Sequence, residues 1–165
     1  MTAPSVVVGL GNEIAGDDGV GIRVAQRIRQ LLTDTPEIDV VPLPWAGLAL
    51  LDVLRDRDRA AIVDCLTSGR VPGTVVRLDE EGFAGSVRLN SFHDIAFPTV
   101  MGLGRRMGWH MPRQVAIWGI EAECIGEFRE GLSPAVAGAV EPVIQEVLGF
   151  MGIVEDRLVP TGVTR

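Results

Sequence analysis

The sequence contains no lysine, and all 15 of its basic residues are arginines. This absence excludes a lysine Schiff base and the lysine of a Walker-type phosphate loop. Tyrosine is also absent, and two cysteines, Cys65 and Cys124, are too few for a disulfide framework. The first residues lack a basic segment followed by a long apolar run, so we expect no signal peptide. No apolar run of membrane-spanning length is present, and we therefore expect a cytoplasmic protein without a membrane partner.

The composition is that of an ordinary globular domain. The chain has 165 residues, of which 47% are hydrophobic and 22% are charged. We expect a single domain over residues 1–152 and a flexible tail over residues 153–165. The formal net charge of -7 argues against a nucleic-acid partner, because an acidic protein gains nothing from counterion release. We also expect a monomer.

Apolar runs and helical patterns alternate along the chain. Runs typical of strands occupy residues 5–10, 38–44, 59–65, 73–79 and 114–122, and helical patterns occupy residues 20–32, 46–56, 98–108 and 133–151. Most of the strand runs are continuously apolar, which is typical of strands buried on both faces. The sequence therefore predicts an α/β fold: a mainly parallel twisted sheet of about five strands with helices on both faces. Pro42 indicates that the second strand ends early or lies near an edge, and the alternation in the fourth also suits an edge.

Three polar residues follow predicted strands and are candidates for one site. Asp18 follows the first strand, Asp64 ends the third, and His93 lies in the loop after the fourth. Ligands of such sheets bind beyond the carboxyl ends of the strands, so we expect these side chains to converge there. Two carboxylates and one imidazole are an ordinary set of transition-metal ligands, and three protein ligands leave coordination positions open.

The stretch "VVVGLGNEIAGDDGVG" places a glycine-rich loop between the first strand and the first helix. The dinucleotide fingerprint fails because its last glycine is replaced by Ile14, and no ribose-binding acid ends the second strand. The phosphate-loop pattern fails because Asp17 and Asp18 stand where lysine and a hydroxyl residue are needed. The loop therefore favours a cation, or it only turns the chain. One of the two aspartates is expected to cap the helix, and we assign Asp17 to that role or to support of the site.

Two other functions stay open at this point. A cysteine hydrolase could use Cys65 and His93, although Cys65 directly follows an apolar run and reads more simply as a buried small residue. A nucleotide- or small-ligand-binding α/β module without proteolytic activity is the other alternative. His110 precedes the last strand and is expected at the opposite edge, whereas Glu121 and Glu123 follow that strand, and one of the two could line the cleft.

Four motifs together resemble the nickel-iron hydrogenase maturation endopeptidases. They are "GLGNEIAGDDGVGIRVAQRI", "AIVDCLTSGRVPGTV", "SFHDI" and "GLSPAVAGAVEPVIQEVL", which occur in the family's order and extend to about residue 149. Asp18, Asp64 and His93 match the family's three metal-contacting positions, although some members carry glutamate where this chain has Asp18.

The resemblance implies a metal-dependent endopeptidase. Its expected partner is the precursor of a hydrogenase large subunit, from which it would remove a short C-terminal extension after nickel has been inserted. The expected metal is nickel carried by the substrate, with Asp18, Asp64 and His93 as both ligands and catalytic residues. Another divalent metal could occupy the site in the isolated protein.

Overall fold

The computed structural model describes residues 3–32, 34–78, 97–126 and 128–153. Its strands form one sheet in the order β2-β1-β3-β5-β4. They are β1 (Ser5–Leu10), β2 (Ile38–Leu43), β3 (Arg59–Leu66), β4 (Val75–Leu78) and β5 (Gln114–Glu121). Neighbouring strands are parallel except β4, which is antiparallel to β5. The predicted mainly parallel sheet is confirmed, and β2 and β4 lie at its edges as expected.

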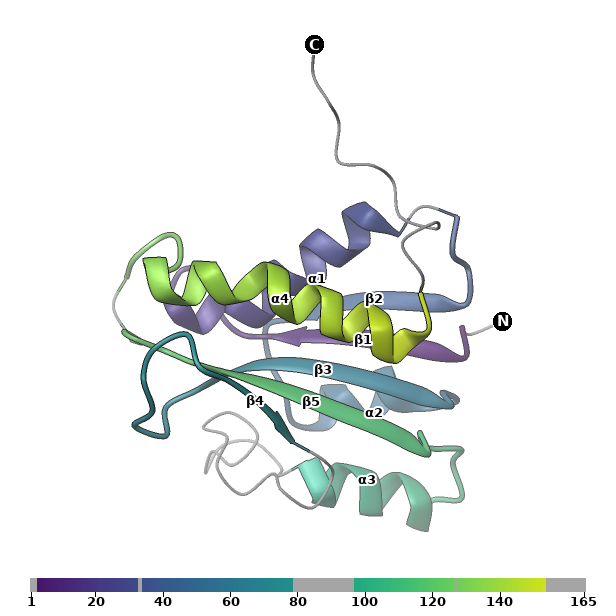
Figure 1. Ribbon diagram of the computed structural model, residues 1–165. Helices are drawn as coiled ribbons and strands as arrows, with labels where there is room; N and C mark the ends of the chain where they lie inside the picture. The colour runs from purple at the N-terminus through teal and green to yellow at the C-terminus, as the bar shows by residue number, and fades with distance from the viewer. Residues whose placement is uncertain (1–2, 33, 79–96, 127, 154–165) are drawn as a thin grey trace.

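Helices cover both faces of the sheet (Figure 1). One face carries α1 (Val20–Leu31) and α4 (Pro134–Met151), and the other carries α2 (Leu48–Leu54) and α3 (Phe97–Arg106). A short 3-10 turn, η1 (Asp17–Gly19), precedes α1. Proline at the first position of α4 costs no hydrogen bond, because that N–H would lack a helical partner anyway.

The inner strands are apolar on both faces because each face has its own core. Val7 of β1 packs in the cluster beneath α1 and α4, whereas Val6 and Val8 pack in the cluster beneath α2 and α3. In β3, Val63 and Ile62 divide between the two clusters in the same way. Side chains alternate between the faces of a strand, so a strand buried on both sides must be apolar at nearly every position.

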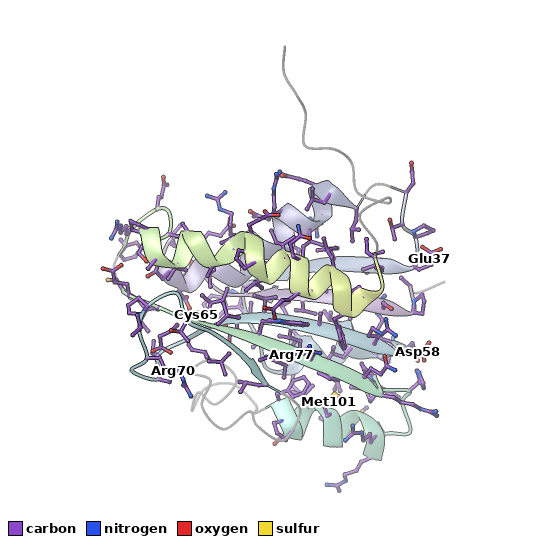
Figure 2. All side chains as sticks on the ribbon, in the orientation of Figure 1. Glu37, Asp58, Cys65, Arg70, Arg77 and Met101 are labelled. Carbon is purple, nitrogen blue, oxygen red and sulfur yellow. The ribbon has the colours of Figure 1, made fainter. Side chains whose placement is uncertain are left out.

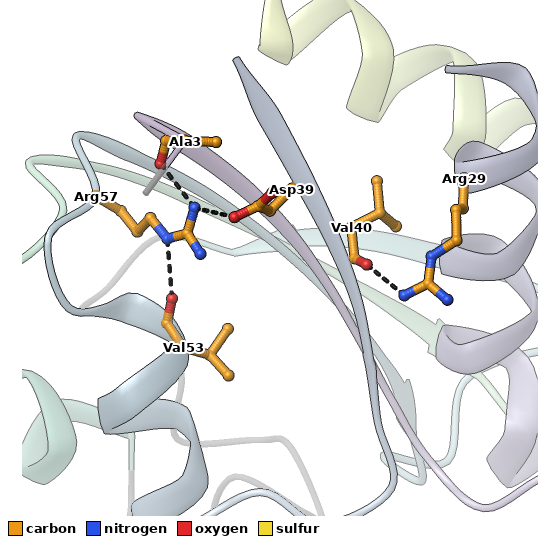
Figure 3. Close-up of polar contacts among 6 residues, drawn as sticks. All are labelled: Ala3, Arg29, Asp39, Val40, Val53 and Arg57. Carbon is orange, nitrogen blue, oxygen red and sulfur yellow. Dashed lines mark hydrogen bonds and ion pairs between the residues drawn. The ribbon is translucent and has the colours of Figure 1, made fainter. Parts of the chain in front are cut away.

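Two arginines attach the edge strand β2 to its surroundings (Figure 3). The buried Arg57 guanidinium donates to the Ala3 carbonyl at 2.7 Å and pairs with the Asp39 carboxylate of β2. Arg29 of α1 donates to the Val40 carbonyl of the same strand. These contacts fix β2 against both α1 and the turn that precedes β3. They lie away from the carboxyl ends of the strands, where the candidate site is expected.

Element boundaries differ from the sequence prediction by a few residues. The predicted third strand ends near Asp64, but β3 continues to Leu66 because its pairing with β5 runs on to Glu121. Asp64 therefore lies within the strand. The predicted tail over residues 153–165 falls almost entirely outside the described residues and stays a prediction. None of the described helices is long and apolar enough to cross a membrane.

Candidate functional site

The glycine loop after β1 is shaped by close backbone packing. A Cβ atom on Gly21 would lie 2.2 Å from the Leu10 carbonyl oxygen and 2.3 Å from the Val63 carbonyl oxygen. Gly11 has a φ of +145°, and the neighbouring Asn12 amide donates to the Asp18 carbonyl at 3.2 Å. The glycines thus allow the start of α1 to press against β1 and β3, a role that requires no phosphate.

Asp17 holds the loop after β5 against this glycine loop. Its side chain is 1% exposed, and Oδ1 accepts a 2.6 Å hydrogen bond from the Ser133 amide. Oδ2 accepts from the Ser133 hydroxyl at 2.9 Å, the Glu123 amide at 2.9 Å and the Cys124 amide at 3.1 Å. Ser133 is the N-cap residue of α4, so the carboxylate also lies at the positive end of that helix. Asp17 therefore organises the site's loops.

Burial raises the pKa of the Asp17 carboxyl, but the hydrogen bonds from Ser133, Cys124 and Glu123 lower it by more, so it falls below its ordinary value of 3.8. Asp17 is consequently ionised at neutral pH. The expectation that an aspartate side chain caps the first helix is wrong, because the N-cap residues of η1 and α1 are Gly16 and Gly19. Asp17 instead bonds to residues more than 100 positions away, which agrees with its alternative role in supporting the site.

The structure brings together the segments that carry Asp18 and Asp64. The turn η1 packs against β3, and the Asp18 and Asp64 side chains are 8% and 0% exposed. Asp64 Oδ1 accepts a 2.8 Å hydrogen bond from the Cys65 amide. His93 lies outside the described residues, so the predicted three-ligand site of Asp18, Asp64 and His93 stays a prediction. Within the described part of the chain, no group of three His, Cys, Asp or Glu side chains is placed to hold a metal ion.

Glu121 is a further buried carboxylate at this edge, and it anchors the loop after β3. Oε1 accepts from the backbone amides of Ser68 and Gly69 at 2.7 Å each and of Arg70 at 3.2 Å, while Oε2 accepts from the Ser68 hydroxyl at 2.7 Å. Burial raises the pKa of Glu121, but these hydrogen bonds outweigh it and the net pKa is lowered. One of Glu121 and Glu123 was expected to line the cleft; Glu121 binds the loop after β3 and Glu123 is exposed.

Cys65, the nucleophile of the alternative hydrolase, is placed unfavourably for catalysis, while its expected partner His93 lies outside the described residues. Cys65 lies in β3, is 3% exposed and belongs to the apolar cluster beneath α1 and α4. Figure 2 shows Cys65 and Arg70 at one end of the sheet, and Glu37 and Asp58 at the other. His110 is exposed, and its Nε2 atom lies 2.8 Å from the Asp58 carboxylate, which confirms that it is remote from the carboxyl edge.

The sequence did not indicate that Asp17 and Glu121 would anchor distant loops through hydrogen bonds to backbone amides. An aspartate in a turn and a glutamate at a strand end are common, and no local pattern states which distant amides they will bind. The one available signal was the acidic pair at positions 17 and 18, because two adjacent carboxylates rarely serve the same purpose.

The fold and the site define a class of protein. It is an α/β domain whose sheet has helices on both faces, and its glycine loop at the carboxyl edge of the sheet is acidic and does not match a phosphate-binding loop. A sequence model described as "HycI: Hydrogenase maturation protease" matches residues 22–150. The chain belongs to the hydrogenase maturation protease family. This confirms the family resemblance and identifies the protein as a peptidase rather than a non-proteolytic binding module.

Relatives and solved structures agree. The chain is 29% identical over 148 residues to the hydrogenase 2 maturation protease of Escherichia coli K12, covering 88% of this chain and 89% of that protein. It is 28% identical over 155 residues to the hydrogenase expression/formation protein HoxM of Azotobacter vinelandii, covering 92% and 74%. The structure of the hydrogenase maturating endopeptidase HybD from E. coli superimposes with a TM-score of 0.76 at 28% identity, covering 90% and 91%.

Proposed function

We propose that this protein is an endopeptidase that removes a C-terminal extension from the nickel-loaded precursor of a nickel-iron hydrogenase large subunit. Membership of the hydrogenase maturation protease family is the observation that carries the proposal. The carboxyl edge of the sheet supports it with two carboxylates, Asp18 and Asp64, on segments that pack together. The site acts in the cytoplasm, on a precursor whose metal is already in place.

In this proposal, Asp18, Asp64 and His93 contact the nickel of the substrate. Nickel held there supplies a Lewis acid. Carboxylate and imidazole groups suit such an ion, and the burial of Asp18 and Asp64 strengthens the attraction of their carboxylates for it. Asp64 is buried, and its Oδ1 atom accepts a hydrogen bond from the Cys65 amide. The fold holds the three metal-contacting side chains in place. Binding of the precursor then brings its scissile bond beside them, in position for hydrolysis.

Recognition of the metal explains why only loaded precursor is cut. Without nickel, the precursor lacks the group that the three side chains hold, and the peptide bond is not positioned. Asp17 contributes indirectly, because its buried hydrogen bonds fix the loop from which Asp18 projects. The Cys65 thiol takes no part in this mechanism.

The decisive experiment mixes the purified protein with nickel-loaded and nickel-free precursor and measures C-terminal trimming by intact mass. We expect trimming of the loaded precursor only. Asp18→Asn and His93→Ala should leave the longer precursor uncut, with folding checked by circular dichroism. His110→Ala is the matched control for His93→Ala, because His110 lies at the opposite edge of the sheet. Equal trimming of nickel-free precursor, or a normal rate with His93→Ala, would contradict the proposal.

A further inference from the structure

Exposed hydrophobic side chains gather at one edge of the sheet. Phe128 is 94% exposed and Trp45 is 72% exposed, in a chain whose other described aromatic residues are at least partly buried. Among the described residues, the exposed large hydrophobic side chains are Ile14, Trp45, Leu48, Val71, Met107, Ile125 and Phe128. All except Met107 follow the carboxyl end of a parallel strand. We call these six residues the apolar rim.

The topology accounts for this placement. The strands β1, β2, β3 and β5 run parallel, so the segments that follow them meet at one edge of the sheet. Figure 1 shows the loops after β3 and β5 together at the left end of the sheet. Met107 follows α3 and lies in the turn that leads back to the start of β5, at the opposite edge. The rim therefore surrounds the edge that carries Asp18 and Asp64.

Backbone hydrogen bonds join two parts of the rim. The Arg129 amide donates to the Ile14 carbonyl at 3.2 Å, and the Gly16 amide donates to the Arg129 carbonyl at 2.9 Å. A β-bridge also pairs Gly16 with Ile125. The loop that carries Asp18 and the loop that carries Ile125 and Phe128 are thus held side by side, and Asp17, the neighbour of Asp18, accepts hydrogen bonds from the Glu123 and Cys124 amides of the second loop.

Ile14 stands between two open grooves. One groove runs toward α4 and is lined by Glu13, Ile14, Gly16, Gly19, Arg23, Glu130, Gly131 and Leu132. The other runs toward β2 and is lined by Gly11, Asn12, Glu13, Ile14, Ile22, Pro42 and Pro44. The second groove ends at Pro44, the neighbour of Trp45 in the chain. The two grooves share Glu13 and Ile14, so Ile14 borders the mainly apolar groove on the β2 side and the groove on the α4 side that also carries Arg23 and Glu130.

We propose that the apolar rim is the docking surface for the protein substrate, the hydrogenase large-subunit precursor. The inference rests on the proposed function, because that function requires a protein partner at this edge. The rim is spread over the loops that follow four strands, so its occupant must be as wide as the edge, which suits a protein surface better than a small molecule. Covering exposed apolar side chains with a partner removes them from water, which makes binding at that surface more favourable. Phe128 and Trp45 are the anchors, since aromatic residues dominate interface energetics.

The test uses the full-length protein and nickel-loaded precursor purified from cells that lack the protease. The Ile125→Ser/Phe128→Ala double variant removes two rim side chains that are already exposed, so the fold should be retained. We expect Kd for the precursor, measured by biolayer interferometry, to rise about tenfold or more, as expected for loss of an aromatic anchor. KM should rise in parallel while kcat at saturation is unchanged. Met107→Ala is the matched control, and its Kd should stay within about twofold of the wild-type value.

The outcomes separate docking from proteolysis. If the double variant loses binding while the wild-type protein binds but does not trim, docking at the rim stands and the proposed function fails. Wild-type trimming with an unchanged Kd and KM in the double variant overturns the docking proposal and leaves the proposed function intact. Wild-type protein that does not bind the precursor at all also overturns docking. Sedimentation equilibrium tests whether a second copy of this chain occupies the rim. If the wild-type protein self-associates and the double variant does not, while the Kd for the precursor is unchanged, the result counts against the proposal.

Discussion

The Ser133 residue donates both its amide and its hydroxyl hydrogen to the Asp17 carboxylate, although 116 residues separate the two in sequence. The amide of the N-cap residue thereby finds a charged acceptor, and the negative charge lies at the positive end of α4. This pair joins the loop that carries Asp18 to the start of the closing helix. The relationship makes the position of Asp18 depend on a residue that contacts no substrate.

Asp17→Asn should destabilise the protein by about 2–3 kcal/mol, because an amide nitrogen would face backbone donors that now bind a carboxylate oxygen. Urea unfolding followed by circular dichroism measures the change. Asp52→Asn, at an exposed position of α2, is the control and should change stability by less than about 0.5 kcal/mol. Similar values for the two variants would show that the buried hydrogen bonds contribute little.

The stability of the protein should fall in acid because of Asp17 and Glu121. Both have folded-state pKa values below their ordinary values of 3.8 and 4.5, so the folded state binds protons less readily than the unfolded state. Their contribution is fully present above these ordinary values and is lost as the pH falls through the lowered folded-state values. The free energy of unfolding should therefore decrease below about pH 4.5. Urea titrations between neutral pH and acid measure this decrease. In Glu121→Gln the free energy of unfolding should depend less steeply on pH. An unchanged pH dependence in that variant would refute the contribution of Glu121.

Cys65→Ala should remain an active enzyme. Its side chain lies in the apolar cluster beneath α1 and α4, so the loss of a small buried group should cost about 1 kcal/mol of stability. Steady-state trimming of nickel-loaded precursor measures the activity, and thermal unfolding measures the stability. A folded but inactive Cys65→Ala, or inactivation by stoichiometric alkylation of Cys65, would instead support the cysteine–histidine hydrolase.

Gly21→Ala should be strongly destabilising, by about 3 kcal/mol or more, because the new methyl group would overlap two backbone carbonyl oxygens that cannot move independently. Gly138→Ala is the matched control in an exposed position of α4, where a Cβ meets nothing within 4 Å. That change should stabilise the helix by about 0.5–1 kcal/mol. Equal effects of the two substitutions in thermal unfolding would contradict the close approach of α1 to β1 and β3.

Much of this architecture could be predicted from local patterns. Continuous apolar runs alternating with helical periodicity indicated a parallel sheet covered on both faces, and the order of elements along the chain is as expected. Pro42 correctly indicated an edge strand, because proline cannot donate to a second neighbour. The topology then placed Asp18 and Asp64 on adjoining segments, since the ends of parallel strands share one edge. Local reasoning failed on the helix cap, because the N-cap residues are Gly16 and Gly19 and Asp17 binds distant amides instead.

By itself, the sequence determined the fold class, the exclusion of a phosphate loop, the family and the candidate residues Asp18, Asp64 and His93. Those conclusions depend on periodicity, residue type and motif order, which are local properties of the chain. Only the tertiary structure decided that Asp17 binds Ser133, that Glu121 binds the loop after β3, and that exposed apolar side chains surround one edge. Hydrogen bonds and exposed surfaces between distant segments depend on how the chain closes in three dimensions, and a buried carboxylate is stabilised by whichever amides the fold brings to it.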